Sequence, residues 1–130
     1  MKNLLEKFNN EKNIIVITLY PPKKTTYNGN GGLYSFGKNF VKNLANKLKN
    51  KIIVVAQKNN GNDESYSENK KIIIIKVIKK DSLFSFLKIL AVYIPKLNYV
   101  KKFIIQFEFN SFGGVKATFG ILILIARAAL

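Results

Sequence analysis

The sequence has no cysteine and no histidine among its 130 residues. Their absence excludes disulfide bonds, thiol nucleophiles, histidine general bases and the cysteine or histidine metal sites common in small proteins. Acidic residues are also scarce, with seven aspartates and glutamates against 22 lysines and arginines. Carboxylate chemistry is therefore restricted to a few positions, and we expect no metal site.

The shortage of acids leaves a net charge of +15. Such a charge normally indicates a polyanion or an anionic membrane as partner. However, Arg127 is the only arginine, and lysine, asparagine and isoleucine recur along the whole chain. That pattern is typical of compositional drift across a genome, so we do not favour a dedicated nucleic-acid-binding face.

Long apolar runs are missing as well. No run reaches the ~18 residues that span a bilayer, and the closest one, Ala117–Leu130, is interrupted by Arg127. The first residues, Met1–Phe8, lack the apolar stretch and cleavage site of a signal peptide. We therefore expect a cytoplasmic protein, with any membrane contact peripheral and on the inner surface.

What the chain does contain is a strand, a glycine-bearing loop and a helix in succession. The apolar segment Asn13–Tyr20 predicts a buried strand, and Pro21 begins a polar loop that reaches Gly32. A helix is predicted from about Gly32 to Leu48, with these residues facing inward: Leu33, Phe36, Phe40, Val41, Leu44, Ala45 and Leu48. This order is the first half of a βαβ unit, whose ligands bind beyond the carboxyl ends of the strands.

Three more strands and two more helices are predicted downstream. The strands are Ile52–Ala56, Ile72–Ile78 and Phe103–Phe107, and a polar loop is expected from Gln57 to Lys70. The helices are Asp81–Leu97, capped by Asp81 or Ser82 and kinked or ended at Pro95, and Ala117–Leu130. Helical crossovers indicate an α/β domain with a mostly parallel sheet and helices on both faces.

The glycines of the first loop are candidates for binding phosphate. Backbone N–H groups at Gly29, Gly31 and Gly32 can approach a phosphate or a sugar hydroxyl, aided by the helix dipole. The loop is long and begins with two prolines, so it does not fit the tight G-x-G-x-x-G turn that binds dinucleotides. It is not a Walker loop either, because no glycine precedes a Lys-Ser or Lys-Thr pair. The alternative is that these glycines form only a flexible connector.

A second polar loop follows the last predicted strand. It contains Gln106, Glu108 and Asn110, and Glu108 is the only acid after Asp81. If the four predicted strands have the order 3-2-1-4, the first and last are neighbours, and this loop faces the glycine loop across one crevice. Glu108 would then act as a base or accept a hydrogen bond from a sugar hydroxyl. The alternative is a surface glutamate paired with a lysine.

The predicted helix Asp81–Leu97 is apolar nearly all round and has lysines on either side of it. Such a helix could dock on an anionic membrane surface. The interpretation that we favour is a helix buried between the sheet and a neighbouring domain.

Three stretches resemble the amino-terminal half of a GT-B glycosyltransferase of the family 4 type. They are Ile14–Pro22 with Gly31-Gly32-Leu33-Tyr34 and Phe40-Val41, then Lys51–Ala56, and finally Ile104-Ile105-Gln106-Phe107-Glu108-Phe109 with Phe112-Gly113-Gly114. The third is similar to a Gln-His-Glu-Phe … Gly-Gly element of these enzymes, except that Phe107 replaces the histidine.

The resemblance implies a three-layer, Rossmann-like domain over residues 1–130, forming the acceptor side of the enzyme. It places Gly31 and Gly32 near the donor phosphates and Gln106 and Glu108 in the cleft. Lys23 or Lys24 would assist the departing diphosphate; the alternative is that both are solvated surface lysines. The donor is a nucleotide-sugar, the acceptor is a glycan or lipid-linked glycan, and no further cofactor is implied.

The donor-binding second domain of such an enzyme has no counterpart in this chain. We therefore expect a truncated gene, a fragment or one subunit of a split enzyme, inactive alone. The alternative is a non-catalytic α/β module that binds a polyanion or an anionic membrane surface, with a steep dependence on salt.

Overall fold

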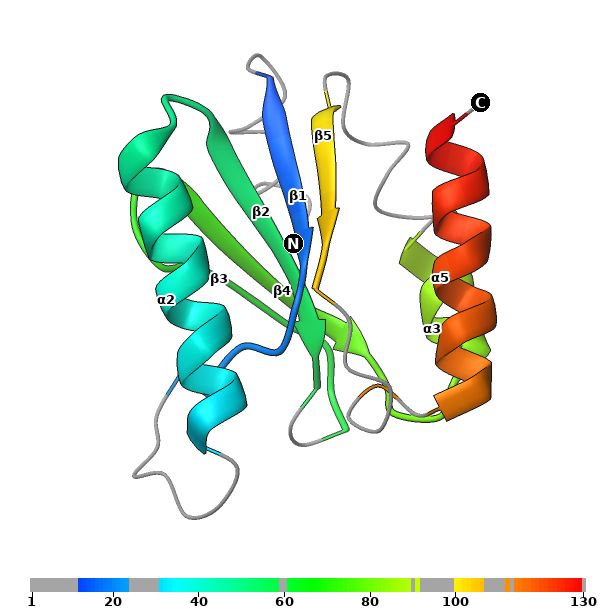
Figure 1. The fold of residues 1–130 in the computed structure, drawn as a ribbon. Coiled ribbons are helices and arrows are strands. Elements are labelled where there is room, and N and C mark those ends of the chain that lie inside the picture. The colour runs from blue at the N-terminus through cyan, green and yellow to red at the C-terminus, as the bar shows by residue number, and fades with distance from the viewer. Residues whose placement is uncertain are drawn as a thin grey trace.

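The computed structural model is an α/β fold with a mixed, mostly parallel sheet of five strands (Figure 1). It describes residues 12–23, 31–58, 61–89, 91, 100–106, 112 and 114–129. The strands are β1 (Asn13–Ile17), β2 (Lys51–Gln57), β3 (Glu64–Ser67), β4 (Ile72–Ile78) and β5 (Val100–Ile105). The helices are α2 (Gly31–Lys47), α3 (Leu83–Lys88) and α5 (Gly114–Ala129).

The strands lie side by side in the order β3-β4-β2-β1-β5. β1 is parallel to both of its neighbours, β2 and β5, and β2 is parallel to β4. The prediction that the first and last apolar strands are neighbours is therefore confirmed. The carboxyl ends of these four strands meet at one edge of the sheet, the lower edge in Figure 1, where α2 and α5 also begin.

The prediction of a polar loop from Gln57 to Lys70 is wrong, because part of this segment is β3. This strand runs antiparallel to β4 and pairs Glu64 with Lys76 and Tyr66 with Ile74. Its sequence, ESYS, lacks the apolar run of a buried strand, but an edge strand of a mixed sheet can expose one face. Tyr66 covers the other face by packing, partly buried, against the cluster beneath α2.

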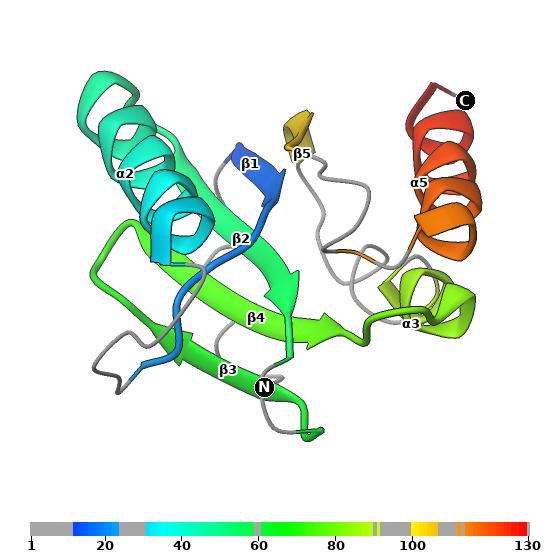
Figure 2. The same cartoon turned by 60° about the horizontal axis from the view of Figure 1, so that its bottom comes forward.

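Alternate residues of the central strands point to opposite faces and form two buried clusters. One cluster includes Val41 and Ala45 of α2 and the strand residues Ile14, Val16, Ile52, Val54, Ile72 and Ile74. The other includes Phe86 of α3 and Ile121 of α5, with Ile15, Ile17, Ile53, Val55, Ile73 and Ile75. Figure 2 shows α2 beside one face of the sheet and α3 and α5 beside the other.

The inward face of α2 was predicted only in part. Val41 and Ala45 are buried, and Phe40, Leu44 and Leu48 pack partly buried beside them. However, Leu33 and Phe36 are 44% and 59% exposed, so their predicted burial is wrong. Gly37 lies against Thr18 and Leu19, just beyond β1, and Tyr34 packs against the cluster that includes Leu19. Phe36 projects about 100° around the helix from Gly37.

Two further contacts fix the ends of helices. At the end of α2, Lys71 Nζ donates to the carbonyls of Ala45 and Leu48, which satisfies carbonyls that the helix leaves without partners. Ser82 lies at the N-cap of α3, but its side chain makes no capping hydrogen bond, so the capping role predicted for it is wrong. Its carbonyl instead accepts a hydrogen bond from Ser85 Oγ at 2.8 Å.

Several boundaries differ from the prediction. β1 ends at Ile17 rather than Tyr20, while β5 begins at Val100 and α5 at Gly114, each three residues earlier than expected. α3 ends at Lys88, and most of its predicted continuation to Leu97 lies outside the described residues. In the part of the chain that the structure describes, no helix is both long and apolar enough to cross a membrane.

Candidate functional site

The candidate site lies where β1 and β5 end side by side. The backbone N–H of Gln106 donates to the carbonyl of Ile17 at 2.8 Å, and the N–H of Thr18 donates to the carbonyl of Val55 at 3.2 Å. The sheet therefore keeps its hydrogen bonding for one residue beyond β1 and β5. This brings Thr18 and Gln106 together at the carboxyl edge, where ligands bind in open α/β sheets.

A side-chain hydrogen bond joins these two residues. Thr18 is 1% exposed, and its Oγ1 donates to Gln106 Oε1 at 2.7 Å. The contact uses the carbonyl oxygen of the Gln106 amide and leaves both N–H donors of its nitrogen for other acceptors. Gln106 is only half-buried, so this amide nitrogen is a hydrogen-bond donor at the sheet edge, fixed in orientation by Thr18.

Helix α2 crosses the same place at very close range. A Cβ atom added to Gly37 would overlap the carbonyl oxygen of Leu19 and come within 2.9 Å of Thr18 Oγ1. Only glycine allows the helix backbone to approach the end of β1 this closely. Gly37 therefore determines how near the first turns of α2 lie to Thr18 and Gln106.

The predicted phosphate-binding glycines are described only in part. Gly31 and Gly32 form the first turn of α2. Among the described residues, and apart from the helix's own backbone, no atom lies within 4 Å of the position that a Cβ of Gly32 would take. The first turn of α2 contains no acidic residue. Gly29 and Lys24 lie outside the described residues.

The chain that leaves β1 runs away from β5. Lys76 of β4 is fully buried, and its Nζ donates to the carbonyl of Pro21 at 2.8 Å. Farther along, Lys23 Nζ lies 5.1 Å from the centre of the Tyr66 ring on β3. Figure 2 shows this segment passing β2 and β4 before α2 begins. Lys23, predicted to assist a departing diphosphate, thus lies three strands away from β1.

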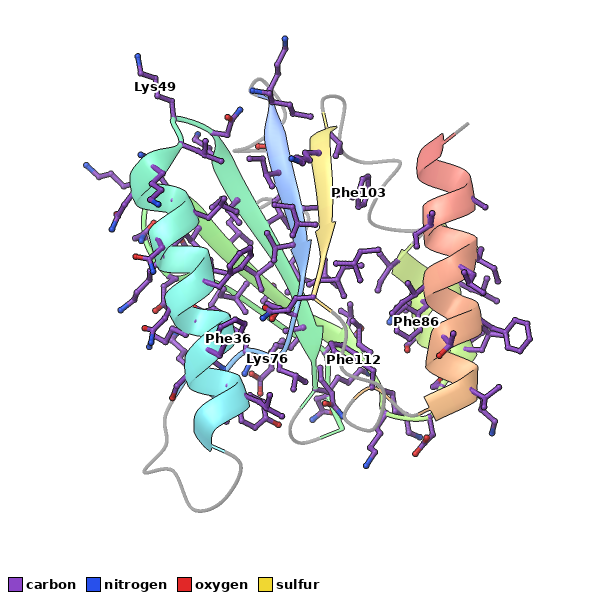
Figure 3. All side chains as sticks on the ribbon, in the orientation of Figure 1. Phe36, Lys49, Lys76, Phe86, Phe103 and Phe112 are labelled. Carbon is purple, nitrogen blue, oxygen red and sulfur yellow. The ribbon has the colours of Figure 1, made fainter. Side chains whose placement is uncertain are left out.

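Lys76 is an unusual residue for the interior of a sheet. Burial lowers the pKa of Lys76, and the carboxylates of Glu64 and Glu68 only partly oppose this effect. Figure 3 shows the side chain on the α2 side of the sheet, toward its carboxyl edge. Lys76 therefore fixes the position of the Pro21 carbonyl, where the chain leaves β1.

Other predicted site residues lie elsewhere or outside the described part. Glu108 and Asn110 belong to the segment 107–111, which the structure does not describe, so their pairing with the glycine loop stays a prediction. Among the described residues, no three carboxylates lie close enough to share a metal ion. One groove lined by described side chains lies on α5.

Thr18, Gly37 and Lys76 were not predicted as site residues. Each nevertheless interrupts a pattern: Thr18 is the one polar residue between Ile14 and Leu19, and Lys76 is the one charge within IIIIKVI. Gly37 stands inside a helix, where glycine costs about 1 kcal/mol relative to alanine. A polar or glycine residue that interrupts an otherwise regular element was thus the available signal.

Comparison with known proteins gives no further assignment. No protein family, no curated protein and no solved structure matches the chain. The function is therefore argued from the residues at the carboxyl edge of the sheet and from the resemblance that the sequence carries.

Proposed function

We propose that this chain is the acceptor-side half of a GT-B glycosyltransferase of the family 4 type, with a Rossmann-like, three-layer architecture. The reaction would transfer a sugar from a nucleotide-sugar to a glycan or lipid-linked acceptor. The second half of such an enzyme binds most of the donor, so the chain would need a donor-binding partner for activity.

The observation that supports this proposal best is the hydrogen bond between Thr18 and Gln106. It joins the ends of the two neighbouring strands that carry the resemblance, and it orients the Gln106 amide nitrogen toward the edge where a sugar hydroxyl or phosphate oxygen would lie. The helix start at Gly31 and Gly32, with no acid in the first turn of α2, favours an anionic group there.

In the proposed site the residues have separate roles. Gly31 and Gly32 offer backbone N–H groups to a donor phosphate, and Gln106 binds a sugar hydroxyl or phosphate oxygen. Glu108 is the candidate base or hydroxyl acceptor. Lys76 acts on none of these groups directly, because its ammonium is buried and bonded to Pro21.

The test is sugar transfer after mixing the chain with the donor-binding domain of a family 4 glycosyltransferase. We expect labelled sugar to move from the nucleotide-sugar to an acceptor glycan, and Gly32→Trp, Gln106→Ala and Glu108→Ala to reduce the rate by roughly 10-fold or more. Lys49→Trp is the control, because it introduces the same indole at the amino end of the sheet, away from the proposed site (Figure 3). Absence of both transfer and nucleotide-sugar hydrolysis with any donor-binding half would refute the proposal.

A binding module for a polyanion is the competing function, and it depends on net charge rather than on the crevice. Its affinity would fall steeply with salt, following counterion release. Gly32→Trp and Glu108→Ala would leave such binding intact. The same variants therefore separate the two functions.

A further inference from the structure

The outward half of α5 is apolar and exposed. Val115 is 63% exposed, Phe119 57%, Leu122 55% and Ile125 50%, and Ile123 is 37% exposed. At 100° per residue these side chains, with Lys116 and Thr118, occupy about half of the helix circumference. The opposite side contains the buried Gly120 and Ile121. The pattern is the reverse of a surface helix, which turns polar residues outward.

The inner side of α5 is already occupied by α3. A Cβ added to Gly120 would lie 2.6 Å from the Phe86 ring, so the two helices are in close contact there. Figure 3 shows Phe86 lying next to α5. Phe84 of α3 points away from this contact and is 74% exposed. The exposed apolar surface therefore consists of the outward half of α5, and Phe84 is a further exposed apolar side chain on the neighbouring α3.

A shallow groove of about 120 Å³ runs along the outward half of α5. Its lining is Val115, Thr118, Phe119 and Leu122, which follow one another at spacings of three and four residues. The groove is therefore a feature of one face of a single helix. It fits flexible apolar chains or a flat apolar layer better than a large folded partner.

Basic residues outnumber acidic ones on the elements that form this surface and on the neighbouring strand. α3, β5 and α5 contain no acidic residue, whereas Lys116 lies on α5 and Lys101 and Lys102 lie on β5. Of the acids in the described part of the chain, Glu64 and Glu68 lie on or beside β3, and Asp63 binds Lys58 and Lys88. Asp81 is the one acid close in sequence to α3. With a net charge of +15 on the whole chain, the surface is complementary to an anionic one.

We propose that the outward half of α5, together with Phe84, docks in the plane of an anionic lipid membrane. The apolar side chains enter the boundary between headgroups and acyl chains, and the lysines contact anionic headgroups. α5 has 16 residues and is about 24 Å long, so it lies along the surface. A second copy is the poorer occupant, since each copy brings the same positive charge to the contact. This docking does not rest on the proposed sugar transfer.

The test is flotation of the full chain with two kinds of vesicle, one of phosphatidylcholine alone and one with one part phosphatidylglycerol to two parts phosphatidylcholine. We expect binding to the anionic vesicles that is at least roughly 10-fold tighter than to the neutral ones. Phe119→Glu should weaken it by roughly 100-fold, because it removes a ring that would enter the membrane and adds a charge that anionic headgroups repel. Phe36→Glu is the matched control: Phe36 is 59% exposed, on α2, and its substitution should change binding by less than about threefold.

Three results would overturn the proposal. They are equal binding to both kinds of vesicle, equal loss in Phe119→Glu and Phe36→Glu, and self-association without lipid that Phe119→Glu abolishes. The last would assign the surface to a second copy. Because Phe119 is exposed, its variant should keep the wild-type circular dichroism spectrum, and Leu122→Ser provides a second, uncharged variant with the same expected direction. Sugar transfer is measured separately, so either proposal can fail alone.

Discussion

The two helical sides of the sheet are built in different ways. On one side, α2 lies directly against the strand ends, where the Gly37 backbone touches Leu19, and its exposed central residues include Lys42 and Asn46. On the other side, α5 packs on α3 through Gly120 and Phe86, and it turns an apolar half outward. The comparison teaches that hydrophobic periodicity locates the sheet-facing side of a helix only when the other side is polar.

Breaking the α2 contact should have the largest effect. Gly37→Val would place two methyl groups and a Cβ against the Leu19 carbonyl and Thr18, and neither the helix nor the strand end can move away independently. We expect a loss of about 3 kcal/mol or more in the free energy of unfolding, measured by urea denaturation.

Gly32→Ala is the control for that substitution. Its Cβ would meet no atom within 4 Å, so the helix should be unchanged or stabilised by a few tenths of a kcal/mol. Equal losses in Gly37→Val and Gly32→Ala would show that α2 does not touch the strand end as described.

Breaking the contact between α3 and α5 should lower the free energy of unfolding by less than Gly37→Val does. Gly120→Ala brings a Cβ to 2.6 Å from Phe86, but a pair of helices can separate slightly without moving the sheet. We expect a loss of about 1–3 kcal/mol in urea denaturation. Phe86→Leu in the same chain should recover part of it by making room. A Gly120→Ala protein as stable as the wild type would place α5 farther from α3.

Because Lys76 is buried, the free energy of unfolding should depend on pH in the alkaline range. The pKa of Lys76 is lower in the folded than in the unfolded chain, so the folded state binds fewer protons between the two values and stability rises with pH there. Relative to Lys76→Met, the free energy of unfolding of the wild type should rise by up to about 1.4 kcal/mol per pH unit as the pH rises toward 10.5. A constant difference between the two proteins, measured by urea denaturation across this range, would mean that Lys76 is not buried.

Removing the ion pairs of Asp63 with Lys58 and Lys88 should have the smallest effect on stability. Burial opposes ionisation of Asp63, but hydrogen bonds from Lys58 and Lys88 outweigh it and lower the pKa of Asp63. Its contribution is therefore present above about pH 3.8 and lost as pH falls through the lower folded value. Because the groups are partly exposed, Asp63→Asn should cost less than about 1 kcal/mol at neutral pH and nothing in strong acid.

The order of the parallel strands was predictable because helical crossovers leave few topologies for apolar strands. β3 was not, since Glu64–Ser67 carries no apolar pattern and gains its place by pairing with β4. The burial of Lys76 was equally hidden, because it depends on Pro21, which is distant in the sequence. Gln106 was predicted to line the cleft, and the structure places it at the sheet edge; its partner Thr18 came only from the structure.

The most direct measurement of the proposed function is the amide NMR spectrum of the chain titrated with UDP-glucose, UDP-N-acetylglucosamine and GDP-mannose. The proposal predicts saturable shifts of the Thr18, Gly32 and Gln106 signals with one of these donors, absent in Gly32→Trp. No shift of these signals, or shifts that persist in Gly32→Trp, would contradict a donor site at the carboxyl end of β1.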